Sequence, residues 1–195
     1  MSPQQPPLRE LPTDVRLTGH GICLREWTDA DVPSLVTLFD DVEIERWTPL
    51  PSPYRIEDAR EHLIKARRLR AEHRAVQLAV TIDGGEPCGE ILLFLATDGL
   101  ENGEAVELAY GIGAAHRRRG LAVRSVRLMA EYAYDELGRT SVLLRIPPDN
   151  AGSRAVARAA GFARTDAEPL VRERADGERV YLDTWLHARD PERDR

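Results

Sequence analysis

The sequence predicts an α/β (α+β) domain with a mixed, mostly antiparallel, twisted sheet of about seven strands flanked by about four helices. Two observations carry this prediction. Short apolar runs bounded by Gly and Pro alternate with longer segments whose apolar residues recur at helical spacing. The composition, 42% hydrophobic and 31% charged over 195 residues, is that of one soluble globular domain with a full core.

The first half of the domain is expected to contain one strand, two helices and a hairpin. After a Pro-rich segment, expected to be a disordered tail over residues 1–16, an apolar strand covers residues 21–27. A first helix follows Thr28, which stands three positions before Asp31 as in a capping box. Two strand-like runs flanking a Gly-Gly pair predict the hairpin. Between them and the first helix, a second helix has one apolar face, made by Ile56, Ala59, Leu63, Ala66 and Leu69.

The second half is expected to hold a strand, a helix, a strand, a short helix and a final pair of strands. The first strand covers residues 105–113, and the last two flank a turn at Asp176-Gly177. The main helix ends near Gly138 and carries one apolar stripe, made by Ala122, Val126, Met129, Ala133 and Leu137. The domain therefore spans residues 17–188, and residues 189–195 form a short charged tail.

Composition and charge exclude several classes of protein. A formal net charge of -6 disfavours nucleic-acid binding, and no apolar run approaches the length of a membrane helix. The start has no apolar signal segment, so we expect a cytoplasmic protein. Cys23 and Cys88 are expected to be buried free thiols, with a disulfide as the alternative. No Cys/His cluster has metal-ligand spacing, so no metal is expected.

Three arginines and a glycine, "HRRRGLA", stand where the main helix begins. The first turn of a helix has unpaired N–H groups and the positive end of the helix dipole, and both stabilise a phosphate. Gly120 lets the backbone approach a ligand closely or adopt a positive φ. The alternative is a solvated basic turn. A Walker A loop is excluded because no Lys-Ser/Thr follows the glycine, and a single glycine is not a dinucleotide fingerprint.

Two motifs extend this pattern into a family resemblance. Arg117-x-x-Gly120-x-Ala122 resembles the acetyl-CoA pyrophosphate loop of the GNAT N-acetyltransferases. The segment "DNAGSRAVARAAGF" resembles that family's second signature through Asn150, Ser153 and a closing Gly-Phe. Residues 40–53 and the following helix are similar to the RimJ/RimL-like branch. The resemblance covers residues 17–187 and implies the GNAT fold.

The same resemblance implies acetyl-CoA as cosubstrate and names the residues that would bind it. The pantetheine arm would pair with the strand edge at residues 112–114, where that strand and the strand at 140–146 splay apart. The implied cofactor-binding residues are Ile112, Gly113, Ala114, Arg117, Arg118, Arg119, Gly120, Leu121, Ala122, Asn150 and Ser153. Asn150 could instead shape its turn, and glycines 111 and 113 could mark either this close approach or a plain bulge.

The catalytic candidates are Glu107 and Ser153. By strict alternation Glu107 lies on the strand face opposite Val106, and a base helps because an amine must lose its proton before attacking a thioester. Glu107 could otherwise be a surface residue, and Glu104 and His116 are weaker candidates. Many relatives carry a tyrosine acid where this chain has Ala157. Ser153 could therefore hydrogen-bond the leaving thiolate, or simply cap its helix.

The acceptor would be a primary amine, either a protein N-terminus or a small molecule. Trp47 and Glu45 lie in a predicted loop that lines the acceptor side in relatives, although Trp47 could equally be a core anchor and Glu45 solvated. Alternative functions are a longer-chain acyl-CoA transferase and a non-catalytic acyl-CoA-binding protein. A homodimer is compatible with the sequence.

Overall fold

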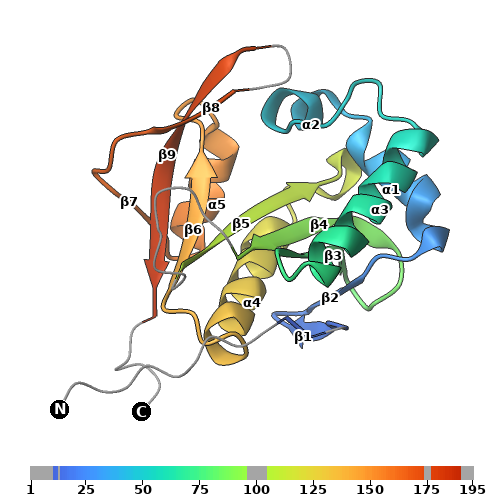
Figure 1. Ribbon diagram of the computed structural model, residues 1–195, viewed down its shortest axis with the longest axis horizontal. Coiled ribbons are helices and arrows are strands. Elements are labelled where there is room, and N and C mark those ends of the chain that lie inside the picture. Colours follow the sequence, from blue (N-terminus) through green and yellow to red (C-terminus); the bar gives the residue numbers. More distant parts are fainter. Residues whose placement is uncertain (1–10, 13, 96–104, 174–176, 190–195) are drawn as a thin grey trace.

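The computed structural model describes residues 11–12, 14–95, 105–173 and 177–189, which form a single twisted sheet flanked by helices (Figure 1). The strand order is β1-β2-β3-β4-β5-β6-β9-β7, with β8 paired to β9. The strands are β1 (Leu17–Gly19), β2 (Ile22–Glu26), β3 (Ala75–Thr81), β4 (Pro87–Phe94), β5 (Ala105–Ile112), β6 (Ser141–Ile146), β7 (Ala163–Arg164), β8 (Leu170–Glu173) and β9 (Arg179–Ala188). The helices are α1 (Val32–Phe39), α2 (Val42–Trp47), α3 (Ile56–Ala71), α4 (Leu121–Asp135) and α5 (Ala151–Ala159), with 3-10 turns at Asp29–Asp31 and Ala114–His116.

The sheet is antiparallel at every described pairing except one. Strands β5 and β6 run parallel, as expected where a helix, here α4, connects them. Their pairing begins at Ala105↔Ser141 and ends at Leu108↔Leu144. Beyond this point the two strands diverge, and Figure 1 shows them as the two arms of a V. The expected splay between them is therefore present.

Helices cover both faces of the sheet and enclose two cores. The larger core holds the apolar stripe of α4 together with the inward side chains of β2 to β6, and includes Val126 and Met129, both fully buried. The smaller core holds α1, Ile44 of α2 and the buried side of α3. Val80 and Ala79 are adjacent on β3 and belong to different cores, because successive side chains of a strand point to opposite faces.

The structure adds three short elements to the expected ones: β1, α2 and β7. They contain three, six and two residues respectively, too few for a hydrophobic period to be visible in the sequence. The segment with Trp47 and Glu45, expected as a loop, is thus the short helix α2, whose first turn is capped by the Asp41 side chain. Leu11 and Val15, within the segment expected as a tail, are buried in the larger core.

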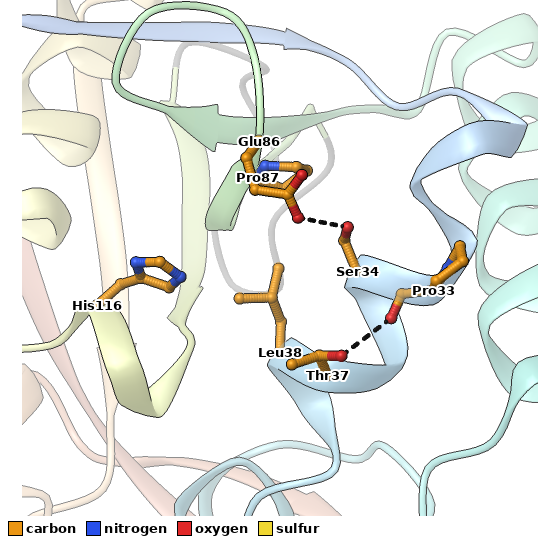
Figure 2. Close-up of a pocket in the computed structure, with 7 residues that line it drawn as sticks. All are labelled: Pro33, Ser34, Thr37, Leu38, Glu86, Pro87 and His116. Atoms are coloured by element: carbon orange, nitrogen blue, oxygen red, sulfur yellow. Dashed lines mark hydrogen bonds between the residues drawn. The ribbon is translucent and has the colours of Figure 1, made fainter.

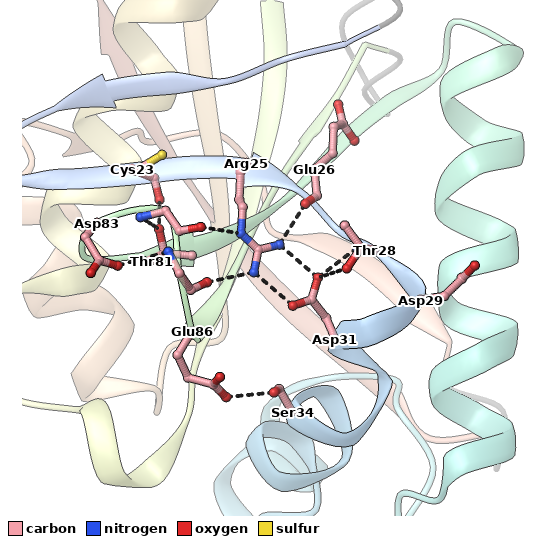
Figure 3. A network of polar contacts seen from close by, with 12 residues as sticks. Cys23, Arg25, Glu26, Thr28, Asp29, Asp31, Ser34, Thr81, Asp83 and Glu86 are labelled. Carbon is pink, nitrogen blue, oxygen red and sulfur yellow. Dashed lines mark hydrogen bonds and ion pairs between the residues drawn. The ribbon is translucent and has the colours of Figure 1, made fainter.

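A buried ion pair fixes the start of α1 to the sheet (Figure 3). Arg25 on β2 makes two bonds of 2.8 Å to Asp31 and also donates to the Gly84 and Gly85 carbonyls of the β3–β4 turn. Asp31 in turn accepts from the Thr28 N–H and hydroxyl, both at 2.8 Å, which is the capping box expected from the sequence. The guanidinium thus joins three segments while its polar groups remain satisfied.

Both cysteines are free and buried, as expected, so no disulfide links Cys23 and Cys88. None of the described helices is long and apolar enough to cross a membrane. Within the described residues, no three His, Cys, Asp or Glu side chains are grouped as a metal site would require.

Candidate active site

The gap between β5 and β6 is lined by backbone that the sheet does not use. The Gly113 N–H donates to the Cys88 carbonyl at 3.1 Å, so this residue faces β4. Because backbone groups alternate in direction along a strand, Tyr110 and Ile112 turn theirs towards β6, beyond its last pair with β5. An extended, amide-bearing ligand can pair with this edge. Of the residues predicted to pair with the pantetheine arm, Ile112 lies at this edge, Gly113 donates to the Cys88 carbonyl and Ala114 begins the 3-10 turn.

The loop after β5 leads into the N-terminus of α4, as expected. Gly120 is the residue before the helix and has φ 72°, a conformation that favours glycine. A Cβ at this position would meet no atom within 4 Å, so the space above it is open. The Arg124 N–H makes the first helical bond, to the Gly120 carbonyl at 3.1 Å. The N–H groups of Leu121 and Ala122 precede it and are available to an anion.

The three arginines of the loop lie in different environments. Arg117 is half-buried, donates to the Ile112 carbonyl at 3.0 Å and pairs with Asp41, the cap of α2. Burial alone would raise the pKa of Asp41, but Arg117 and the first amides of α2 outweigh it and lower that pKa. Arg118 and Arg119 are exposed. Arg117 therefore joins the loop to α2, while the positive charge open to solvent comes from the other two.

Two glycines near the end of β5 are explained by close packing of helices. A Cβ at Gly113 would come within 2.3 Å of the Leu38 side chain on α1. One at Gly111 would meet Ile44 of α2 at 3.4 Å. β5 pairs regularly with β4 up to Gly89↔Ile112, so these glycines mark no bulge. They bring α1 and α2 against the strand, which places α2 beside the gap.

Glu107 lies at the mouth of the gap, one residue before the last β5–β6 pair. Its side chain is 6% exposed, which rules out the surface alternative. Arg172 of β8 donates to its Oε2 at 2.8 Å, and the Arg145 Nε of β6 lies 3.9 Å from the same oxygen. Two guanidinium groups therefore lie against the carboxylate, and an incoming ammonium group would have to compete with them. Glu104 lies outside the described residues.

A second buried carboxylate lies on the same sheet face. Glu90, opposite Gly111 on β4, accepts from Gln77 at 2.7 Å and pairs with His62 of α3 at 2.9 Å. Burial alone would lower the pKa of His62, but the negative charge of Glu90 outweighs it and raises that pKa. The sequence analysis missed this cluster because its members come from three separate elements.

Asn150 and Ser153 stand at the start of α5. The Asn150 Oδ1 accepts from the Ser153 N–H at 2.9 Å and so caps the helix. Asn150 therefore caps α5, and Ser153, for which capping was the alternative role, does not. Ser153, at the third helical position and half-buried, keeps its hydroxyl for other contacts.

Tyr110 is a site residue that the sequence analysis did not identify. It lies on β5 two residues beyond the last β5–β6 pair and packs against the larger core. Its hydroxyl is completely buried and, in the part of the chain that the structure describes, has no partner with hydrogen-bond geometry. Burial raises the pKa of Tyr110 to about 12, with the nearby Ser153 side chain acting in the opposite direction. Strand alternation puts Tyr110 on the same face as Val106, towards the larger core. Its position at the gap follows only from the point at which β6 separates from β5 in the folded sheet.

Helix α2 presents Trp47 and Glu45 at its surface. Trp47 is half-buried, donates to Glu43 at 2.9 Å and lies under the Arg46 guanidinium, 4.5 Å from the ring centre. It belongs to neither core, which rules out the core-anchor alternative. Glu45 is exposed. Arg46 is 3.8 Å from Asp149, beside Asn150, so α2 reaches across to the start of α5.

His116, a weaker candidate base, lines a shallow pocket between α1 and the start of β4 (Figure 2). On the opposite wall the Ser34 hydroxyl donates to Glu86 at 2.7 Å. The pocket has a volume of about 170 Å³, below the roughly 300–1,000 Å³ of typical small-molecule sites. We assign it no ligand.

Residues 22–163 match the family model described as an acetyltransferase (GNAT) domain. This match covers most of the chain, and the protein belongs to the GNAT acetyltransferase family. Members of this family are enzymes that take the acetyl group from acetyl-CoA, which is the cosubstrate that the two sequence motifs predicted. No curated protein sequence matches the chain.

Solved structures share this fold. A candidate ribosomal-protein-serine acetyltransferase from Vibrio cholerae has a TM-score of 0.77 at 17% identity, over 92% of this chain and 100% of that one. The microcin C7 self-immunity acetyltransferase MccE, in complex with acetyl-CoA and AMP, has a TM-score of 0.75 at 14% identity, over 88% of this chain and 94% of that one. RimL, the ribosomal L7/L12 α-N-protein acetyltransferase in complex with CoA, has a TM-score of 0.71 at 16% identity, over 89% of this chain and 98% of that one.

The residues of the gap and loop fit acetyl-CoA. The backbone of Tyr110 and the Ile112 N–H can pair with the pantetheine amides, since the Ile112 carbonyl already accepts from Arg117, and the open N-terminus of α4 can hold the pyrophosphate. When bound there, acetyl-CoA would supply an activated acetyl group as a thioester.

Proposed function

We propose that this protein transfers an acetyl group from acetyl-CoA to a primary amine that enters from the Glu107 side of the β5–β6 gap. The observation that carries the proposal is a buried carboxylate at the mouth of this gap, next to a free strand edge and an open helix N-terminus. The acceptor is a protein N-terminus, as the name of RimL states for that protein, or a small-molecule amine.

Glu107 is proposed to receive the amine and take its proton, directly or through water. The carboxylate pairs with Arg172, whose side chain is 44% exposed and can move aside for an acceptor. Glu45 and Trp47 on α2 are proposed to contact the acceptor, because α2 lies beside the end of β5. Arg118, Arg119 and the amides of Leu121 and Ala122 are proposed to bind the phosphates.

A panel of amines and N-terminal peptides tests this function. Purified protein is mixed with acetyl-CoA and each pool, and free CoA thiol is measured. Release with one pool supports the proposal and begins to define the acceptor. Binding of acetyl-CoA without release in any pool would contradict it and favour an acyl-CoA-binding protein. Release only with longer acyl-CoA donors would replace acetyl by another acyl group.

Substitution of Glu107 tests the assigned role. Glu107→Gln should lower kcat by about 10²-fold, as for other general bases, and leave the Kd for acetyl-CoA within twofold. Glu90→Gln is the matched control, because it neutralises another buried carboxylate on the same sheet face that also has a cationic partner. Equal loss of kcat in both variants would contradict a specific role for Glu107.

A further inference from the structure

Tyr110 combines three properties that no other described residue shares. Its hydroxyl is completely buried without a hydrogen-bond partner of good geometry among the described residues. It lies beyond Leu108, where β6 has left β5, so its position borders the gap. It also has the Ser153 side chain of α5 as a polar neighbour. A buried hydroxyl without a partner is costly to the folded state, so its retention at this position calls for an explanation.

The sheet places Tyr110 and Glu107 on opposite faces of the same strand. Val106, Leu108 and Ile112 share the Tyr110 face, which packs on the larger core, while Glu107 meets Arg145 and Arg172 on the other face. An amine that enters from the Glu107 side adds to the thioester carbonyl carbon, and the sulfur of the tetrahedral intermediate points away from the nitrogen at a tetrahedral angle. The opposite face of the strand, which carries Tyr110 and has Ser153 beside it, is the side left for this sulfur.

The helix that carries Ser153 has small side chains on the face that Ser153 and Ala157 share. Ser153 and Ala157 are four residues apart on α5 and therefore lie on one face of that helix. Ala157 is fully buried and ends at its Cβ, so the phenol on this side of the gap comes from β5, while α5 contributes only the Ser153 hydroxyl. This position is the one at which many relatives carry a tyrosine.

We infer that Tyr110 is a catalytic residue that donates its hydroxyl hydrogen bond to the sulfur of CoA as the thioester is cleaved, assisted by Ser153. This inference rests on the proposed acetyl transfer. The amine nitrogen forms a bond to the carbonyl carbon, and the C–S bond breaks with its electron pair remaining on sulfur. The proton that the amine loses to Glu107 balances the one that the CoA thiolate gains on release. The products are an amide and CoA thiol.

The raised pKa of Tyr110 defines the kind of assistance. A phenol with a pKa of about 12 stays protonated at neutral pH, so it is always ready to donate a hydrogen bond. It is a weaker acid than an ordinary thiol, whose pKa is roughly 8.5, and therefore keeps its proton while stabilising the thiolate. Tyr110 acts in this way as an electrostatic donor to charge that develops on sulfur.

Tyr110→Phe is the direct test, because it removes one oxygen and keeps the ring. We expect kcat to fall by about 10²-fold, as when one oxyanion donor is lost, with the Kd for acetyl-CoA within twofold. The thiol of bound CoA, titrated by the ultraviolet absorbance of its thiolate, should have a higher pKa in this variant than in the wild type. Ser153→Ala should shift both quantities in the same direction by less.

Tyr132→Phe is the matched control, since it removes another buried tyrosine hydroxyl that has no hydrogen-bond partner of good geometry in the described parts of the chain, on α4 rather than at the gap. It should change neither kcat nor the pKa of bound CoA, and thermal unfolding should show that both variants are folded. An unchanged thiol pKa and kcat in Tyr110→Phe, or equal effects of the two variants, would overturn the inference. If the wild type binds CoA but acetylates no amine, the proposed function fails, while the thiol titration still decides whether Tyr110 contacts the sulfur.

Discussion

The two edges of β5 differ sharply. Towards β4 the strand is paired from Glu107 to Ile112, and a glycine on β4 brings the two backbones into close contact. Towards β6 the pairing ends at Leu108, and the remaining backbone faces a gap. One edge of β5 therefore belongs to the paired sheet, and the other borders the proposed ligand site. Because the β4 edge is closed, a ligand can pair with this strand only along the edge that β6 leaves open.

The largest expected effect is on the closed edge. A Cβ at Gly89 would lie 2.3 Å from the Gly111 carbonyl oxygen, a backbone atom that cannot move aside alone. Gly89→Ala should therefore lower the free energy of unfolding by about 3 kcal/mol, measured by urea denaturation. Gly120→Ala is the same change on the open side, where no atom lies within 4 Å, and should cost only about 1–2 kcal/mol for its positive φ. Equal costs would remove the distinction between the two edges.

A second effect is expected on acetyl-CoA binding at the start of α4, where the phosphates are proposed to lie. Gly120→Asp places a carboxylate where the phosphates are proposed to lie, and should weaken acetyl-CoA binding by about 10-fold or more in a calorimetric titration. Gly177→Asp is the control, because Gly177 also has a positive φ and open space around it but lies beside β9. Similar affinity in both variants would place the phosphates elsewhere.

The smallest effect is a dependence of stability on pH within the scaffold. The pKa of His62 is raised above 6.5 by Glu90 despite burial, so its contribution to stability is fully present below pH 6.5 and is lost as pH rises through the raised value. The difference in unfolding free energy between the wild type and His62→Gln should shrink over this range. A difference that grows with pH would contradict the assignment.

The fold was predictable from the sequence where the signals are local. The apolar stripe of α4 recurs at helical spacing and is buried, and Gly138, which was expected to end this helix, has a positive φ. The alternation along β5 predicted which residues share a strand face, although both faces of this strand are largely buried. The family motifs then fixed the order of elements. The short helix α2 was not predictable, because six residues carry less than two turns of period.

The site was less predictable, because its contacts join distant residues. Glu107 meets Arg172 across 65 positions, and Arg117 meets Asp41 across 76, so no local pattern reveals either pair. Alternation placed Tyr110 on the core face correctly. Its unpartnered hydroxyl at the gap follows only from where β6 ends its pairing, which is a property of the assembled sheet.

We propose that acetyl-CoA binds along the open edge of β5 and at the start of α4. Hydrogen–deuterium exchange with and without saturating acetyl-CoA tests this placement. We expect protection of backbone amides over residues 109–123 and 150–153, with none added over β3 and β4. Binding without protection of these segments, or protection confined to other parts of the chain, would contradict it.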